Sequence, residues 1–303
     1  MNEKRDVYLF LDSGAVSLYN KNAKSHKEKR MGSLFRDRKY VDYSYFSTQQ
    51  FLDFRDDYAK HVIKNDGKLT AYINMDVINN AEDSYKSLKY LEGKGCHPLP
   101  VWHLGNDPKW LERYLKEGYD YICIGGITPN SYVKVKEPLD KIWSDVLTDS
   151  TGMPKVRVHG LAATGFYVLR RYPWFSADSS SWRKAAAYGK VFIPKMPKFR
   201  NEGFDFSRPP CVIGVSHDSP TQEKRGQHLY SLNRGEQRHV KRWFDRIGVP
   251  LGKVDEEGEM TEWGLVSHHN ARGLANAHYF IELGKSIPKW PWPIHFKSKR
   301  RLF

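Results

Sequence analysis

Short apolar runs recur along the first 180 residues, and each ends in or beside an aspartate, a histidine or a glycine. The first run, VYLFL at residues 7–11, is predicted to be a buried strand and leads directly into Asp12. Five further runs of this kind occupy residues 69–74, 99–103, 119–124, 155–160 and 173–177. Helical segments separate them, and strands that alternate with helices are typical of a parallel sheet built from βα units.

The segments between the runs have helical spacing and recognisable ends. Asn106-Asp107-Pro108 offers an N-cap and an N1 proline, and Gly118 closes that helix. The expected helices cover residues 47–65, 81–92, 107–117, 138–147, 165–171, 237–247 and 271–286. The pattern favours an α/β fold of the (β/α)8 TIM-barrel type, irregular in its details. A doubly wound sheet is the alternative, but no GxGxxG follows the first strand.

At 303 residues the chain can bury a large core. We expect one domain, residues 1–303, without an internal repeat or low-complexity tract. Its parts are a core at 5–182, a basic loop at 183–210, a C-terminal part at 211–290 and a basic tail at 291–303. The run CVIGVS at 211–216 is a candidate for one more strand, whereas residues 217–265 give no clear indication of their fold.

The formal net charge of +14 is large for this length and indicates a polyanionic partner, with nucleic acid ahead of a membrane surface. Aromatic residues make up 14% of the chain, so some are available to stack on bases. Two basic stretches are candidates for phosphate binding, with solvated surface as the alternative. Their cations are Lys21, Lys24, Lys27, Lys29 and Arg30 in the first, and Arg183, Lys184, Lys195 and Lys198 in the second.

No apolar run approaches the roughly 18 residues of a membrane-spanning helix, and the opening MNEKRD is charged. The three cysteines, Cys96, Cys123 and Cys211, are scattered and odd in number, which suits a reducing compartment. No cysteine–histidine spacing indicates zinc. We therefore expect a cytoplasmic protein with no metal and no membrane contact.

The residues at the strand ends form the candidate site: Asp12, Asp76, His103, Gly125-Gly126 and Asp178. Barrel enzymes place their chemistry at the carboxyl ends of their strands. Each residue also has a structural alternative. The aspartates are possible turn formers or helix caps, His103 a satisfied core histidine, and the two glycines a plain tight turn.

The set resembles the tRNA-guanine transglycosylase superfamily, barrel enzymes that exchange guanine for a 7-deazaguanine in nucleic acid. Asp12-Ser13-Gly14-Ala15 is similar to the family's DSGGFQ element. Asp76 stands where the family has a base-reading aspartate, and His103 where it has a base-contacting glutamine. The family's Gly-Gly-Leu loop resembles Gly125-Gly126-Ile127.

Asp178, in WFSADSSSW, stands where the family carries its nucleophilic aspartate, and residues 276–280 are similar to its HN-x-x-YY helix. The zinc site of the tRNA enzymes is missing. Only Cys211 remains of its cysteines, and Ala275 stands where its histidine precedes the asparagine. The chain therefore most resembles the 7-deazaguanine DNA transglycosylases of bacteriophages and bacterial modification islands, which implies DNA as substrate and, for a phage protein, the host cytoplasm.

The chemistry that this resemblance implies needs no cofactor. Asp178 traps the oxocarbenium-like C1′ as a covalent glycosyl-enzyme, and Asp12 is the candidate acid and base toward the bases, with a hydrogen bond to the base as its alternative role. Asp76 accepts from the guanine edge, while His103 and the amides of the glycine loop read O6 and the 7-substituent. The partners are a free 7-deazaguanine, such as the 7-cyano form, and DNA whose target base is flipped out or already single-stranded.

Three other functions remain open from the sequence. The first is the same exchange on tRNA. The second is a barrel that binds nucleic acid without catalysis, and the third is a glycosidase or nucleosidase that hydrolyses the trapped intermediate. The missing zinc region, which supports dimerisation in bacterial members, favours a monomer.

Overall fold

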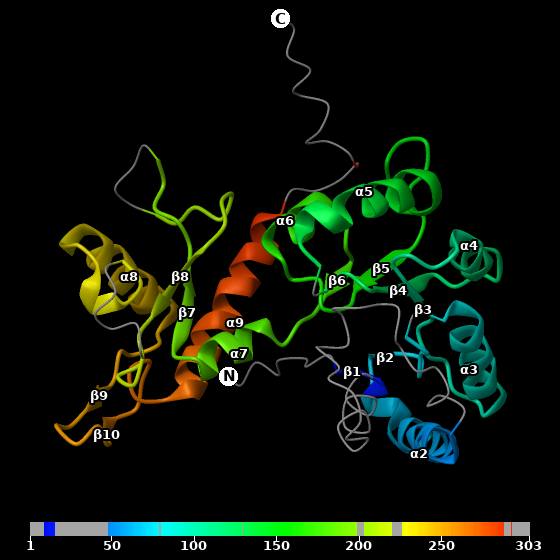
Figure 1. The fold of residues 1–303 in the computed structure, drawn as a ribbon, viewed down its shortest axis with the longest axis horizontal. Helices are drawn as coiled ribbons and strands as arrows, with labels where there is room; N and C mark the ends of the chain where they lie inside the picture. The colour runs from blue at the N-terminus through cyan, green and yellow to red at the C-terminus, as the bar shows by residue number, and fades with distance from the viewer. Residues whose placement is uncertain are drawn as a thin grey trace, which may run out of the picture. The chain divides into compact units, whose positions relative to one another are not determined.

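The computed structural model describes residues 9–15, 48–78, 80–128, 130–198, 203–219, 226–287 and 292. Within these ranges the chain is a mixed α/β protein with helices and parallel sheets (Figure 1). Contacts divide it into two compact units, residues 1–178 with 290–303, and residues 179–289. The expected single domain spans both units and stays a prediction, so each unit is described by itself.

The first unit alternates short strands with helices, as the sequence predicts. Its strands are β1 (Phe10–Leu11), β2 (Ala71–Tyr72), β3 (Val101–His103), β4 (Tyr121–Gly125), β5 (Arg157–Gly160) and β6 (Ser176–Ala177). Its helices are α2 (Gln49–Asn65), η3 (Asp66–Lys68), α3 (Ala81–Gly93), α4 (Pro108–Lys116), α5 (Tyr132–Ile142), η4 (Trp143–Leu147) and α6 (Phe166–Arg171).

All six strands pair in parallel and in the order of the chain. β1 pairs with β2, and β3, β4, β5 and β6 follow one another in a second sheet. A parallel bridge between Ile73 and Leu99 connects β2 to the segment that enters β3. Sequential parallel order is what successive βα units produce when each crossover runs the same way.

The row of parallel strands is strongly curved, as a contact between side chains of β1 and β5 shows. The Phe10 ring stacks on His159 with 4.4 Å between ring centroids. Neighbouring strands lie about 4.8 Å apart, so a flat sheet would separate these two strands by about 19 Å. Among the described residues the ladders do not close into a barrel.

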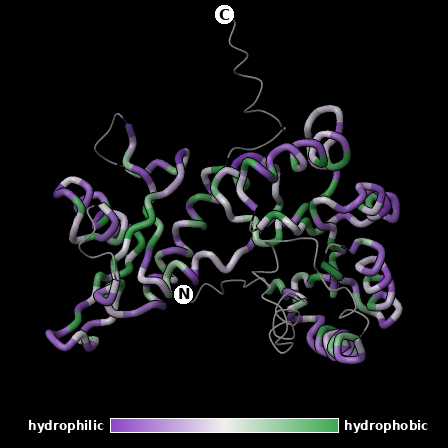
Figure 2. The backbone as a smooth tube through the Cα atoms, viewed as in Figure 1, coloured by the Kyte–Doolittle hydropathy of each residue, from purple (hydrophilic) through white to green (hydrophobic). Residues whose placement is uncertain are grey.

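Successive residues of the strands face opposite sides, which separates two hydrophobic clusters. Ile122, Ile124 and Val158 pack with Trp143 and Tyr172 against the helices. A smaller inner cluster contains buried Ile73, Val101 and Cys123. Figure 2 shows the strands as hydrophobic and the helices as mixed, as expected when only one helix face is covered.

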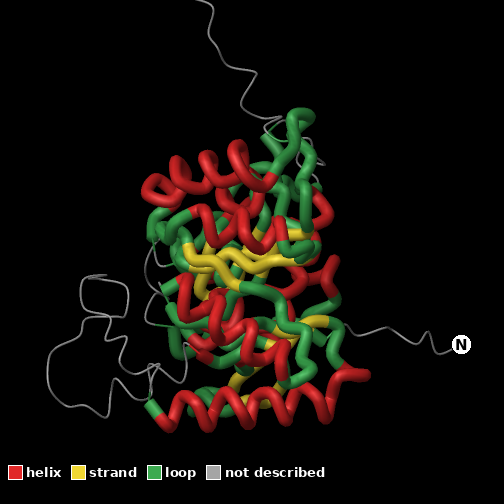
Figure 3. The backbone as a smooth tube through the Cα atoms, turned by 90° about the vertical axis from the view of Figure 1, so that its right-hand side faces the viewer, coloured by secondary structure: helices red, strands yellow, loops and turns green. Residues whose placement is uncertain are grey.

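The helices of this unit begin and end where the sequence supplies caps. The side chain of Asp107 accepts from the amide of Lys109 ahead of N1 Pro108, and Leu111 and Tyr114 turn α4 onto the core. Thr48 caps α2 and Asn80 caps α3 in the same way. In Figure 3 the strands of this unit run between helices.

One expected helix is misplaced. The sequence predicts a helix over 138–147 that begins at a proline, but α5 begins at Tyr132 and holds Pro138 inside. Pro138 lacks an amide hydrogen, so it cannot complete the bond to the preceding turn. Its side chain is exposed, and the helix continues past it into the π-helical turn Trp143–Leu147.

The second unit contains antiparallel strands and helices. Its elements are α7 (Ser181–Ala187), β7 (Lys190–Ile193), β8 (Cys211–Gly214), η5 (Leu229–Ser231), α8 (Arg234–Ile247), β9 (Lys253–Val254), β10 (Met260–Glu262) and α9 (His269–Ser286). β7 pairs with β8, and β9 with β10, in both cases antiparallel.

One expectation for this part of the chain is wrong, and another is confirmed only as to the presence of a strand. The predicted basic loop at 183–210 contains most of α7 and all of β7, because SWRKAAA is rich in helix formers and KVFI alternates in burial. The strand at 211–216 exists as β8, but it is antiparallel to β7 instead of continuing the parallel set. Among the described residues between these two strands, 194–198 and 203–210, no helix forms, and an antiparallel pair needs no helical crossover.

α9 holds the second unit together through two buried polar side chains. Arg272 donates from Nε to the Ala186 carbonyl and from Nη1 to the Leu265 carbonyl, at 2.8 Å each. Asn276 accepts from the Phe192 amide at 2.8 Å and donates to the carbonyls of Trp182 and Lys190. Buried groups with this many partners fix the helix position on α7 and β7.

No helix within the described ranges is both long enough and apolar enough to cross a membrane.

We expect Asn276→Ala to lower the free energy of unfolding by about 2–4 kcal/mol, because it removes three hydrogen bonds that join α9 to the backbone of α7 and β7. Urea denaturation followed by circular dichroism measures this loss. Asn270→Ala, at an exposed position of the same helix, is the matched control and should change stability by less than about 0.5 kcal/mol. Equal losses of stability in the two variants would contradict the role of Asn276 in holding α9 against α7 and β7.

Candidate active site

Four of the predicted side chains lie at the carboxyl ends of neighbouring parallel strands. Asp12 directly follows β1, Asp76 follows β2, His103 ends β3 and Asp178 directly follows β6. The curvature of the strands brings these ends within electrostatic range of one another, since the charges of Asp76 and Asp178 both act on Asp12. The residues therefore form one cluster.

Asp76 and His103 form a buried pair. His103 Nε2 donates to Asp76 Oδ2 at 2.7 Å, and the two residues are 7% and 5% exposed, respectively. Gly125, opposite His103 in the parallel ladder, leaves room for the imidazole: a Cβ there would stand 3.0 Å from His103 Cε1. The glycine predicted as part of a base-reading loop thus has a second, steric reason to be small.

The carboxylate of Asp178, directly after β6, contacts a backbone amide and a histidine. Its Oδ1 accepts from the Ala162 amide at 2.8 Å and lies 3.5 Å from His159 Nε2. Ala162 has a φ of +53°, a left-handed conformation that is uncommon for alanine and aims this amide at the carboxylate. The side chain of Asp178 remains 56% exposed, so it is accessible to a substrate.

His159 lies beside Asp178 but is absent from the set of site residues predicted from the sequence. Its Nδ1 forms a hydrogen bond with Ser176 Oγ at 2.6 Å. The Ser176 hydroxyl also forms a hydrogen bond with the Tyr121 hydroxyl at 2.6 Å. Phe10 covers one face of the ring. These contacts hold Nε2 toward Asp178. The one signal in the sequence was a histidine at the end of the predicted strand KVRVHG.

The environment shifts the pKa values of Asp12 and Asp178 in opposite directions. Burial raises the pKa of Asp12, and the charges of Asp76 and Asp178 raise it further against the amides of Gly14 and Ser13. Burial also acts to raise the pKa of Asp178, but His159 and the Ala162 amide together lower it below its usual value. Asp12 is thus the more readily protonated of the two aspartates and Asp178 the more readily ionised.

The pKa of Cys123 responds to all three carboxylates of the site. Its thiol is fully buried in the inner cluster, and burial raises its pKa. The charges of Asp76, Asp178 and Asp12 all add to this increase. A thiol in such surroundings stays protonated and is no nucleophile.

The remaining predicted base-binding residues lie in the loops beside these side chains. Ser13 is buried and accepts from the Ala15 amide, and Gly14 adopts a φ of +73°. Gly126 has a φ of +76°, which turns the chain after β4. Ile127 lines a small cavity of about 110 Å³, together with Ala162 and residues at the start of α5 and α6.

The predicted phosphate-binding cations are only partly within the described ranges. Lys21, Lys24, Lys27, Lys29 and Arg30 lie outside them. Arg183 and Lys184 are exposed on α7, with Arg183 lying 5.9 Å from the centre of the Trp182 ring. Lys198 is exposed, whereas Lys195 is partly buried with its Nζ 3.0 Å from Cys211 Sγ.

Within the described ranges, no three histidine, cysteine or acidic side chains are arranged to hold a metal ion. Comparisons with protein-family models, curated proteins and solved structures gave no match for this chain.

The opposite pKa shifts predict opposite effects on stability. A raised folded-state pKa means that stability is lost as the pH rises through it, so Asp12→Asn should raise the melting temperature at pH 7. A lowered folded-state pKa contributes stability above the unfolded pKa, so Asp178→Asn should lower the melting temperature at pH 7. Thermal denaturation of both variants beside the wild type measures these shifts.

Each variant is the control for the other, since both convert an aspartate at a strand end to its isosteric amide. Both differences should shrink below about pH 4, where the unfolded aspartates become protonated. Melting-temperature changes of the same sign at pH 7 would contradict the opposite pKa shifts of Asp12 and Asp178.

Proposed function

We propose that the protein is a base-exchange transglycosylase that replaces guanine in DNA with a 7-deazaguanine through a covalent intermediate on Asp178. The observation that carries this proposal is the pair of aspartates with opposite pKa shifts at one cluster of strand ends. An ionised carboxylate and a protonated carboxyl are the two groups that retaining cleavage of a glycosidic bond requires.

We further propose that the six parallel strands form the curved part of an irregular (β/α)8-type barrel. Their sequential order and the stacking of Phe10 on His159 support this proposal. In such a barrel the carboxyl ends of the strands surround one opening, which is where barrel enzymes bind their substrates.

In the first half of the reaction, an Asp178 oxygen attacks C1′ of the target deoxyguanosine. The C1′–N9 bond breaks, and Asp12 gives its proton to the departing guanine, so the base leaves neutral. Asp178 is then esterified to C1′ and Asp12 is ionised. The Ala162 amide, 2.8 Å from Oδ1, holds the attacking carboxylate in place.

In the second half, the incoming 7-deazaguanine gives its N9 proton to Asp12, and N9 attacks C1′. The ester bond to Asp178 breaks, which restores both carboxyl groups to their starting states. Both the bond broken and the bond formed are N-glycosidic, so the exchange consumes no energy-rich cofactor. Asp76, fixed by His103, is placed to accept from the amide and amine edge of either base.

Mass spectrometry of nucleosides tests the reaction, the substrate and the nucleophile together. DNA and tRNA are isolated from cells that express the protein and contain a measured supply of 7-cyano-7-deazaguanine. We expect a 7-deazaguanine deoxynucleoside in DNA and a loss of about 10⁴-fold or more with Asp178→Ala. Asp149→Ala, in an exposed turn, is the matched control and should retain activity.

Three results would contradict the proposal. Modified tRNA with unmodified DNA would make the substrate wrong, and abasic DNA without added base would make the protein a hydrolase. If neither nucleic acid changes while the base is present, the protein is a nucleic-acid-binding barrel without this activity.

His159→Ala should lower kcat by about a hundredfold, because it removes the group that orients Asp178 and keeps it ionised. The acid limb of the pH profile should also move to higher pH, since the Asp178 pKa rises without its partner. His159→Gln, which keeps a donor, should recover part of the activity. A lower kcat with an unmoved acid limb would show that His159 is only structural.

A further inference from the structure

Helix α8 of the second unit has one buried face and one cationic face. His239, Val240, Trp243 and Phe244 are each at most 5% exposed and pack into the unit. Arg234 and Arg238 are four residues apart, and Lys241 and Arg242 follow three and four residues after Arg238, which places these cations along the other side of the helix. Asn233 and Glu236 form a capping box that fixes the first turn.

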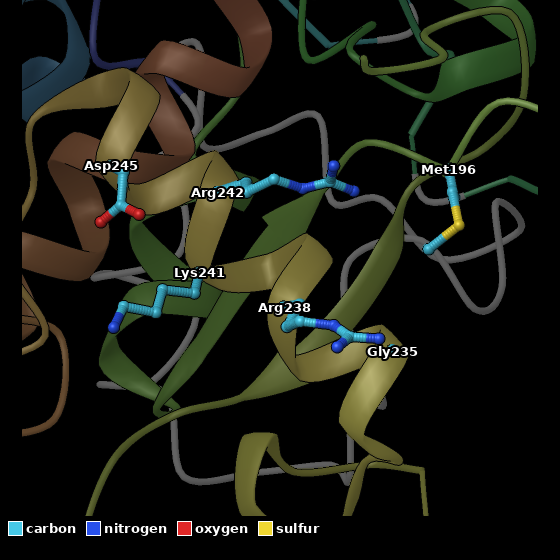
Figure 4. A pocket seen from close by; sticks show the side chains of 6 residues that line it. All are labelled: Met196, Gly235, Arg238, Lys241, Arg242 and Asp245. Carbon is cyan, nitrogen blue, oxygen red and sulfur yellow. The ribbon is translucent and has the colours of Figure 1, made fainter. Parts of the chain in front are cut away.

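A cleft of about 490 Å³ lies along this cationic face. Arg238, Lys241 and Arg242 line it, with Asp245, Gly235 and Met196 completing the walls. Figure 4 shows Arg238 and Arg242 extending from α8 toward the side of Met196. Gly235 has no side chain to fill the space beside Arg238. We call this hollow the α8 cleft.

The cations of the α8 cleft have no ion-pair partner among the residues that the structure describes. Within the described ranges, neither Arg238, Lys241 nor Arg242 has a carboxylate within 4.0 Å, whereas Arg246 on the same helix pairs with Glu282 at 3.3 Å. Among the described residues of the lining, Asp245 is the one acidic side chain. Three cations against one carboxylate in a concave site create a positive potential that attracts anions.

The walls of the α8 cleft are held in place by the core of the unit. His239, next to Arg238, lies with Nε2 2.8 Å from the Pro194 carbonyl. Lys195 then pairs with Asp205 through both backbone bonds. These contacts fix the segment that carries Met196 against α8, so the cations stand in a preformed site.

We propose that the α8 cleft binds the phosphodiester backbone of the nucleic-acid substrate. The inference rests on the proposed function for the identity of the substrate. Arg238 and Arg242 are about 6 Å apart along the helix axis, so the cations span more than one phosphate. Arginine forks match phosphate oxygens in pairs, and lysine adds a point charge. A sequence-independent contact of this kind would position the strand without reading its bases.

The test is the salt dependence of DNA binding by the full chain. Arg238, Lys241 and Arg242 are replaced together by glutamine, and binding of a fluorescein-labelled DNA oligonucleotide is followed by fluorescence anisotropy between about 50 and 200 mM salt. Each phosphate contact contributes about 0.9 to the slope of log K against log salt on duplex DNA, and about 0.7 on a single strand. The slope should therefore fall by about 2–3.

Lys116→Gln/Lys134→Gln/Lys141→Gln is the matched control. It removes three exposed cations of the first unit that also have no ion pair within the described ranges, so the change in net charge is the same. Its slope should stay within about one of the wild type. If the cleft variant loses secondary structure by circular dichroism, the single change Arg238→Gln replaces it, with an expected fall of about one.

Two outcomes would overturn the inference: an unchanged slope in the cleft variant, or an equal fall in the control. Displacement of DNA by polyglutamate at equal charge concentration would also overturn it, because the cleft would then be a site for acidic peptides. Asp178→Asn separates the two proposals. We expect this variant to lose base exchange, which tests the proposed function. Its salt slope for DNA binding should equal that of the wild type, because Asp178 is not part of the α8 cleft.

Discussion

The curvature of the parallel strands is the constraint on which the candidate site depends. Four of the strands have a polar residue of the candidate site at or after their carboxyl ends, but a flat sheet would leave these residues in a row too long to act together. The stacking of Phe10 on His159 shows that β1 and β5 face each other. Because the strands curve, the carboxylates following β1, β2 and β6 act on one another and on the Cys123 thiol.

The same curvature gives two identical side chains different chemistry. Among the described residues, the backbone amides of Gly14 and Ser13 stabilise the charge of Asp12, and two other carboxylates favour its neutral form. Asp178 has the Ala162 amide and His159, and His159 is itself oriented by Ser176 and covered by Phe10. A carboxyl that is more readily protonated and one that is more readily ionised, at the ends of these strands, are the basis of the proposed exchange.

Local sequence signals predicted most of the first unit. Caps at Thr48, Asn80 and Asp107 place the starts of three helices, because the orphan amides of a first turn need a nearby side chain. Pro138 misled the prediction, since a proline reads as a helix start although an exposed one inside a helix is tolerated here. The second unit was harder, because the antiparallel pairing of β7 and β8 depends on which strands meet, not on their composition.

The sequence by itself determined which residues end the strands, and it therefore identified Asp12, Asp76, His103, Gly125 and Asp178 as one set. Period-two burial and helix caps are local, so a single chain displays them. Only the tertiary structure decided that Asp76 pairs with His103, that His159 supports Asp178, and that the α8 cations share one cleft. These facts depend on distances between residues far apart in the chain, and pKa values follow from such distances and from burial.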